Sequence, residues 1–315
     1  MPLPGVPSVP LAGRVPRRLL ACALVVFVAG CHVAPGTPPA RIELSAQPNG
    51  VAVSPGDGGL FITDDRSNAI LWSQDRSTYE AYAHVPVVPG QPNGLSQLVL
   101  AQPDTLLVAR FGFGETGAVF IVSSHGGAQP LTGLATDRRR LGLAPIGPGR
   151  VLSSWFIKRD GQPITGGVSL VSYDVAAQAA TERDLIAGLT KPVGLAVRGD
   201  ALLVSDQNRN VILRYDLRVL LAAQAPVPAQ SGAMVAQVES PDLLAIDSAG
   251  TLYTKCHAHA VCRVEPDGTV TSLADDFQDA RGVAIDDARH TLYVVDRAKS
   301  TSPTASAIRV IPLSR

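Results

Sequence analysis

The sequence has little charge and few aromatic residues, and neither sign of charge is in excess. Charged residues make up 17% of its 315 residues, aromatic residues make up 5%, and 27 basic residues balance 27 acidic ones. Nucleic-acid-binding domains present a basic face, so this balance argues against nucleic acid as a partner. The hydrophobic share of 46% is large enough for a buried core and sets the chain apart from disordered proteins.

The sequence also lacks the short motifs of common catalytic sites. It contains no G-x-S-x-G, H-E-x-x-H or phosphate-binding loop, and no histidine stands at motif spacing from a serine and an acid. The sequence therefore identifies no catalytic residue.

The hydrophobic run near the N-terminus is too short to span a bilayer. Residues 19–29 form an apolar run of 11 residues, whereas a membrane-spanning helix needs roughly 20. The run follows Arg14, Arg17 and Arg18 and precedes Gly30 and Cys31. A basic stretch, a short apolar stretch and small residues before a cleavage site predict a secretory signal peptide over residues 1–30.

Residues 28–31, Val-Ala-Gly-Cys, resemble the lipobox of bacterial lipoproteins. In that family the cysteine receives a diacylglycerol and becomes the new N-terminus. The resemblance implies a lipidated Cys31, a flexible tether over 31–39 and anchoring to a membrane by acyl chains. His32, where some lipoproteins have Asp, implies the outer membrane of a bacterial cell envelope, facing the periplasm. The alternative is an ordinary signal peptide that happens to contain a cysteine.

One pattern recurs six times after residue 40. It consists of a proline or polar residue, then a variable residue, then a position that is usually glycine, and then an apolar run. Successive copies are 39 to 52 residues apart, and each is followed by further short β-type runs. A repeat of this length fits a propeller blade of four strands. The copies are QPNGVAV (47–53), QPNGLSQL (91–98), RLGLAPI (140–146), KPVGLAV (191–197), SPDLLAI (240–246) and ARGVAID (280–286).

The sixth copy lacks its fourth strand because the chain ends at Arg315, whereas residues 41–46 (RIELSA) form a strand-like run that belongs to no copy. Adding this run to the last blade would close the ring and leave no open sheet edge. We therefore expect an all-β fold over residues 40–315: a six-bladed β-propeller closed by an N-terminal strand at about 41–46.

Second strands that end in Asp before a turn, as in LLVSDQNRNVILRYD (202–216), make the chain similar to NHL-type and gluconolactonase (senescence-marker-protein-like) six-bladed propellers. The resemblance covers nearly everything after residue 40. It implies fold more than function, because this fold carries lactonases, esterases, lyases and binding proteins.

Two cysteines remain once the signal peptide and Cys31 are set aside. Cys256 and Cys262 flank a short hairpin, KCHAHAVC, and an exported protein meets oxidising conditions, which favours a disulfide between them. The alternative is a metal site that also uses His257 and His259. Its ligand spacing does not match known zinc modules.

In propellers the residues that begin the inner strands surround the mouth of the central channel. The residue before each repeated glycine is expected there, and carbonyl and carboxylate oxygens of Asn49, Asn93 and Asp242 suit a divalent cation such as calcium. Metal-dependent propeller lactonases use a Glu, an Asn and an Asp at such positions, but no Glu stands here. Asn49 and Asn93 otherwise read as turn residues. In ring order the six residues are Asn49, Asn93, Leu141, Val193, Asp242 and Arg281.

A second site at the same mouth is expected from Arg110, Trp155 and Arg281, which together suit an anionic or planar ligand.

The function predicted first is an exported, membrane-anchored propeller lipoprotein that binds a small molecule or a protein partner at the channel mouth or the outer loops. The alternative is a divalent-metal-dependent hydrolase, a lactonase or esterase of the gluconolactonase type.

Overall fold

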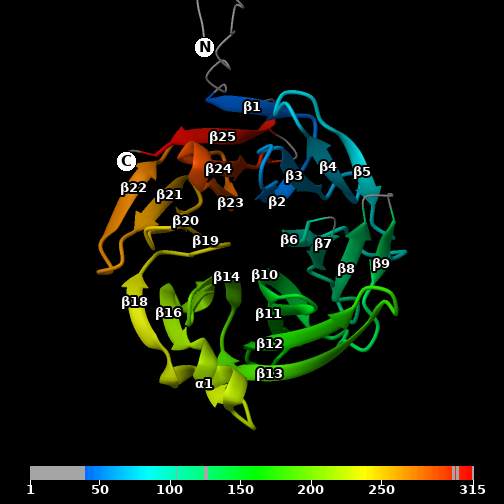
Figure 1. Ribbon diagram of the computed structural model, residues 1–315, viewed down its shortest axis with the longest axis vertical. Helices are drawn as coiled ribbons and strands as arrows, with labels where there is room; N and C mark the ends of the chain where they lie inside the picture. The colour runs from blue at the N-terminus through cyan, green and yellow to red at the C-terminus, as the bar shows by residue number, and fades with distance from the viewer. Residues whose placement is uncertain (1–39, 104, 124–126, 300–301, 303–304, 314–315) are drawn as a thin grey trace, which may run out of the picture. The chain divides into compact units, whose positions relative to one another are not determined.

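The computed structural model describes residues 40–315 except 104, 124–126, 300–301, 303–304 and 314–315. Its strands form six sheets that stand around one axis (Figure 1). The predicted six-bladed β-propeller is therefore confirmed. In the described part of the chain, no helix is both long and apolar enough to cross a membrane.

In each of the first three blades, successive strands are added in order from the inner edge of the sheet to its outer edge. The third blade gains a fifth strand, because β17 adds to its outer edge in parallel. The strands are, in blade one, β2 (Pro48–Val53), β3 (Leu60–Asp64), β4 (Ala69–Ser73) and β5 (Glu80–His84); in blade two, β6 (Leu95–Gln102), β7 (Thr105–Arg110), β8 (Ala118–Ser123) and β9 (Ala128–Pro130); and in blade three, β10 (Arg139–Gly147), β11 (Arg150–Ile157), β12 (Thr165–Asp174), β13 (Ala179–Leu189) and β17 (Val227–Pro228).

The other three blades have four strands each. They are, in blade four, β14 (Pro192–Arg198), β15 (Ala201–Asp206), β16 (Val211–Asp216) and β18 (Ala233–Gln237); in blade five, β19 (Ala245–Ile246), β20 (Leu252–His257), β21 (Ala260–Val264) and β22 (Val270–Ala274); and in blade six, β23 (Ala280–Asp286), β24 (Thr291–Asp296), β25 (Ser306–Pro312) and β1 (Arg41–Leu44). The helical segments are η1 (Gln207–Arg209), α1 (Leu217–Ala222), η2 (Ala229–Ser231) and η3 (Asp287–Arg289).

The first strand of the described residues completes the last blade. β1 pairs antiparallel with β25, so that Ile42 lies opposite Ile308. The Arg41 guanidinium donates to the Asp296 carboxylate at 2.8 Å, across 255 residues of sequence. Ile42 and Leu44 are buried among Leu60, Ile62 and Tyr293, so β1 also fills the space between blades six and one. The predicted closure is confirmed (Figure 1).

Repeated glycines lie where the inner strands of neighbouring blades approach one another closely. A Cβ atom on Gly194 would overlap the carbonyl oxygen of Asp242, and one on Gly282 would meet the carbonyl oxygen of Asn49. The repeat therefore needs glycine for backbone-to-backbone packing around the axis. This is a structural reason for the glycine, independent of any ligand.

Candidate functional site

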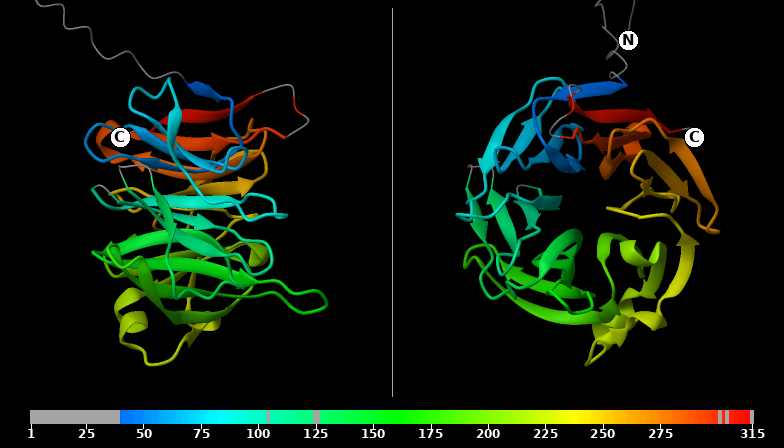
Figure 2. Two further views of the ribbon diagram at one scale, coloured as in Figure 1. Left: turned by 90° about the vertical axis from the view of Figure 1, so that its right-hand side faces the viewer. Right: turned by 180° about the vertical axis from the view of Figure 1, so that it is seen from behind.

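One face of the ring carries both the starts of the inner strands and the loops that join each second strand to the third. This follows from the antiparallel order, since the inner strand leaves this face and the second strand returns to it. We call it the mouth face. The hairpin between β11 and β12 projects from the ring on one side (Figure 2).

The repeat seen in the sequence is out of register in blade two. Pro48 pairs with Asp64 in blade one, and Leu95 pairs with Arg110 in blade two. Pro48 and Leu95 are therefore equivalent, and so are the residues that follow them. Ser96, not Asn93, thus stands at the position of Asn49. Asn93 precedes β6, and its amide Nδ2 donates to the Asp65 carbonyl at 3.1 Å. The expectation that Asn93 lies in the same ring position as Asn49 is thus corrected.

Each of the three predicted metal ligands has a hydrogen-bond partner within the protein. The Asn49 Nδ2 donates to the Leu95 carbonyl at 2.8 Å. Asp242 is buried and accepts from the Leu243 amide, and its other oxygen lies 3.7 Å from the Arg281 guanidinium. Arg281 belongs to blade six, between the blades that carry Asn49 and Asp242. Within the described residues, no group of three or more His, Cys, Asp or Glu side chains is placed to hold a metal ion. A cation site at Asn49, Asn93 and Asp242 therefore stays a prediction.

Arg281 instead belongs to a cluster of charges from blades five and six. Its guanidinium binds the Asp279 carboxylate at 2.7 Å, and the buried Lys255 ammonium lies 3.1 Å from the other oxygen of Asp279. Lys255 stands in β20 where Thr63 stands in β3. The sequence signal for this cluster was the lysine in LYTKC, at a position that holds a small hydroxyl residue in LFITD and LLVSD.

Lys191 stands at the start of blade four, and the side chain of Gln207, which its ammonium contacts, donates to the carbonyl oxygen of Pro241, next to Asp242, at 3.2 Å. The Asp206 carboxylate accepts from the Lys191 amide at 2.8 Å, which fixes the backbone just before β14. The Lys191 ammonium donates to the Gln207 side-chain oxygen at 2.5 Å, and among the described residues no carboxylate lies within 4.0 Å of it. It is thus a half-buried cation without an ion-pair partner in the described chain.

Burial lowers the pKa of Lys191. The negative charge of Asp242 acts in the opposite direction, and the positive charges of Arg281, Lys255 and Lys158 lower the pKa further. Four charges from blades three to six therefore act on Lys191.

Asp206 also shows what the repeated aspartates do. An aspartate before a turn commonly accepts hydrogen bonds from that turn. Asp206 makes no side-chain bond to η1 and instead accepts from Thr190 and Lys191, in the segment before the inner strand. Asp64 does both, since it accepts from Gln47 before β2 and from the following turn.

The opposite half of the mouth face is apolar. Leu141 and Val193 pack with Phe156 and Leu243 in a buried cluster, and Phe111 covers it in part. The Arg139 guanidinium lies 5.3 Å from the centre of the Phe111 ring, in cation–π contact. The mouth face thus combines an apolar half with a charged one.

Arg110 and Trp155 make contacts with residues other than Arg281. Arg110 donates to the carbonyl oxygens of Thr116 and Pro86 and so ties a loop to the neighbouring blade. Trp155 is only 7% exposed, with the Arg138 guanidinium 3.8 Å from its ring centre. Its indole nitrogen donates to Ser169. Both side chains are occupied by structural contacts, whereas Arg281 lies in the charged cluster.

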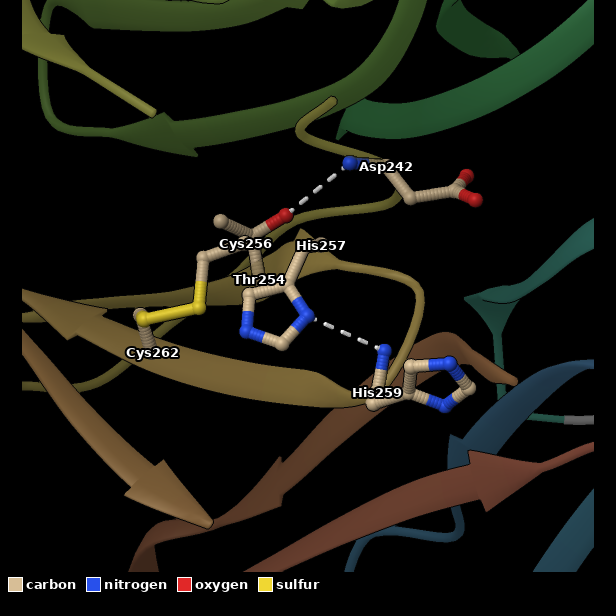
Figure 3. Close-up of a disulfide and its surroundings, with 6 residues drawn as sticks. All are labelled: Asp242, Thr254, Cys256, His257, His259 and Cys262. Atoms are coloured by element: carbon tan, nitrogen blue, oxygen red, sulfur yellow. Dashed lines mark hydrogen bonds between the residues drawn. A yellow bond between two sulfur atoms is a disulfide. The ribbon is translucent and has the colours of Figure 1, made fainter. Parts of the chain in front are cut away.

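Cys256 and Cys262 form a disulfide across the hairpin between β20 and β21 (Figure 3). The predicted pairing is confirmed, and it removes both thiolates from any metal site. His257 accepts from the His259 amide at 3.3 Å, and the His259 ring contacts the Phe277 carbonyl oxygen at 2.7 Å. The two histidines thus shape the turn.

Comparison with known proteins supports the fold. No protein-family profile and no curated protein matches the sequence. A gluconolactonase from Xanthomonas campestris has a TM-score of 0.62 at 16% identity, over 87% of this chain and 88% of that one. Regucalcin, a calcium-binding protein from Agrobacterium tumefaciens, has a TM-score of 0.62 at 14% identity, over 88% and 95%. A virginiamycin B lyase from Staphylococcus aureus has a TM-score of 0.56 at 12% identity, over 86% and 98%.

At such low identities the likeness establishes a common fold and nothing about activity. The resemblance to gluconolactonase-type propellers stated from the sequence is confirmed at that level.

Proposed function

We propose that the mouth face binds a small organic carboxylate, with Lys191 as the cation that receives it. The observation that carries this proposal is the half-buried Lys191 ammonium, which has no carboxylate within 4.0 Å among the described residues. Around it, Lys255 and Arg281 share Asp279, and Arg281 also approaches Asp242. Three cations therefore face two carboxylates, and an added anion would balance the surplus charge.

The apolar half of the mouth face suits the rest of such a ligand. Phe111 and Phe156 lie on that side, next to the position of Lys191, whose ammonium is 5.9 Å from the Phe156 ring centre. A carboxylate attached to a ring or a short alkyl chain would contact both halves at once. Benzoate is a suitable probe.

Replacing Lys191 by methionine is expected to weaken benzoate binding roughly 10- to 100-fold, the effect of losing one charge-assisted hydrogen bond. Isothermal titration calorimetry of the wild type and Lys191→Met measures it. Lys299→Met removes an exposed lysine and serves as the matched control, and Lys191→Arg should retain most of the affinity. Equal affinities of the wild type and Lys191→Met would contradict the proposal.

A metal-dependent lactonase or esterase is the second candidate, favoured by the likeness to a gluconolactonase and to a calcium-binding protein. If the mouth face binds a metal ion, the positive charge of Arg281 repels that ion. Arg281→Ala should therefore strengthen calcium binding. If the mouth face binds anions, the same substitution should weaken benzoate binding. Titrating this variant with both probes distinguishes the two functions.

We also propose that the protein is exported and held at the outer membrane by a lipid on Cys31, with the propeller in the periplasm. Residues 1–39, including Cys31 and the predicted tether, lie outside the residues that the structure describes. The support is the signal-peptide pattern and its lipobox.

Replacing Cys31 by serine should abolish acylation, so the protein would leave the membrane fraction or keep its signal peptide. Fractionation and intact-mass measurement of wild type and Cys31→Ser test this. A wild-type mature chain with unmodified mass would refute the anchor.

A further inference from the structure

Blades four and five are neighbours in the ring (Figure 1), and a cavity of about 670 Å³ lies between them. β14 ends at Arg198 and β20 begins at Leu252, and both residues line this cavity. Inner strands end and second strands begin on the face of the ring opposite the mouth face, so the cavity lies on that opposite face. We call it the rear groove, and its volume is typical of sites for small organic molecules.

Contacts between the two blades bound the rear groove on both sides. Towards the ring axis, the Arg198 guanidinium reaches from the end of β14 to the turn before β20 and donates to the Ala249 carbonyl oxygen at 2.9 Å. On the outer side, Gly268 in the turn before β22 lies so close to the Val235 carbonyl oxygen of β18 that a Cβ atom would overlap it. The two walls of the groove are therefore fixed relative to each other.

The walls of the rear groove are aliphatic. Leu203 and Leu252 belong to the core between blades four and five, and Ile246 and Val235 extend their apolar surface. Among the described residues that line the groove, none is aromatic. Met234 also lines it and is 66% exposed, so apolar surface is left open to solvent here. An alkyl chain bound in the groove would cover this surface.

Arg214 supplies a charge at the rear groove. It stands in β16 opposite Leu203 of β15 and Ala233 of β18, and all three residues line the groove. Its side chain is exposed, and among the described residues no carboxylate lies within 4.0 Å of its guanidinium. Arg214 is thus a cation without a counter-charge beside an apolar wall.

The acidic residues of the rear groove have other partners. Glu265 forms an ion pair with Arg263 at 3.1 Å. Asp267 accepts a hydrogen bond from the Thr269 amide of its own turn. Arg198, like Arg214, carries no ion pair, because the acceptors of its guanidinium are backbone carbonyl oxygens. The excess of positive charge favours an anionic ligand.

We propose that the rear groove binds an aliphatic carboxylate, with its alkyl chain against Leu203, Leu252 and Met234 and its carboxylate at Arg214. This site is separate from the mouth face and goes beyond the function proposed above. Arginine suits the anionic end, because its planar guanidinium can donate two parallel hydrogen bonds to one carboxylate. Burial of the alkyl chain supplies most of the affinity, since an exposed ion pair contributes little.

Calorimetric titration with octanoate and 1-octanol tests both parts of the proposal. The full-length protein carries Lys191→Met, which removes the cation proposed for the mouth face and so separates the two sites. Arg214→Met should weaken octanoate binding about 5- to 10-fold and leave octanol binding unchanged, because octanol has no charge. The control, Arg209→Met, removes an exposed arginine of η1 on the mouth face and should change neither affinity. Equal octanoate affinities of these two variants would overturn the role of Arg214.

A second variant obstructs the rear groove. Ala233 is exposed and lines the groove, so Ala233→Phe places a large side chain there without disturbing the core. Octanoate and octanol should then both bind at least about 10-fold more weakly, since part of the alkyl chain is excluded. Unchanged affinities for both probes would show that they bind elsewhere and would overturn the site.

Met234 gives a local readout of binding. The sequence contains two methionines, Met1 and Met234, so labelling with ¹³C-methyl methionine gives at most two methyl signals in the NMR spectrum. Met234→Leu identifies the signal of Met234 by its loss. Saturating octanoate should shift this signal, and Arg214→Met should need about 5- to 10-fold more octanoate for the same shift. A Met234 signal that does not move at saturation would overturn the rear groove as the binding site.

Discussion

Deleting residues 41–46 is expected to lower the free energy of unfolding by about 5 kcal/mol, a large part of the stability of a typical domain. Ile42 and Leu44 are about 95% buried between blades six and one, and each contributes roughly 1.5–3 kcal/mol by burial. The deletion also removes the bond from Arg41 to Asp296 and leaves β25 as an open edge. Urea unfolding followed by circular dichroism measures the change.

Two controls locate the effect in β1. Glu43 is exposed on the same strand, so Glu43→Ala should change stability by less than about 0.5 kcal/mol. Deleting residues 32–39, the predicted tether, should cost little. If deleting 41–46 and deleting 32–39 gave the same stability, the closing role of β1 would be wrong. An increase in aggregation with the first deletion alone would agree with an exposed sheet edge.

Glu182→Gln is expected to destabilise the protein by about 3–5 kcal/mol, because it leaves a buried guanidinium without its counter-charge. The Arg140 side chain is 0% exposed, and its two terminal nitrogens donate to the two Glu182 carboxylate oxygens at 2.9 and 2.8 Å. Arg138 binds the same carboxylate at 2.8 Å. The double variant Arg140→Met/Glu182→Leu should be less destabilised than Glu182→Gln, since no charge is then left buried.

An exposed ion pair gives the matched comparison. Arg159 and Asp137 are 2.9 Å apart, with side chains 58% and 34% exposed. Asp137→Asn should therefore cost less than about 1 kcal/mol. Equal costs for Glu182→Gln and Asp137→Asn would show that the buried network does not stabilise the fold.

The same carboxylate should make stability depend on pH. Burial alone would raise the pKa of Glu182, but the hydrogen bond and charge of Arg140 and the charge of Arg138 outweigh it and lower the pKa to about 2. The stabilisation is thus present above the ordinary value of 4.5 and is lost as the pH falls from 4.5 towards about 2. Stability should drop by about 3 kcal/mol over this range in the wild type and by less in Glu182→Gln.

The sequence predicted the architecture because the propeller is encoded locally and repeatedly. Each copy contains its own strands and turns, and the inner glycine reports close backbone packing, as Gly194 does against Asp242. The closing strand was predictable because one strand-like run belonged to no copy of the repeat. The disulfide was predictable because Cys256 and Cys262 flank one hairpin.

The candidate site was predicted less well because it depends on contacts between blades. Nothing in the letters QPNG showed that Asn93 lies outside the inner strand, since that depends on pairing between Leu95 and Arg110. The sequence predicted that Trp155 faces a ligand, but its ring is covered by Arg138, which lies just before the neighbouring strand β10. Lys191 was missed because it opens an ordinary copy of the repeat, and its unpaired state follows from side chains far along the chain.

Closing the ring with the first strand has a consequence for how the protein is made. β1 is the first of the described strands to be synthesised, and its partner β25 follows more than 250 residues later. While the chain emerges, Ile42 and Leu44 have no complete site to fill, and the growing ring exposes an edge at each end. Bringing such distant strands together is slow, because loop closure costs entropy before the contact repays it. The finished propeller can therefore assemble only after its last blade has emerged, and truncation near the C-terminus should leave β1 without a partner.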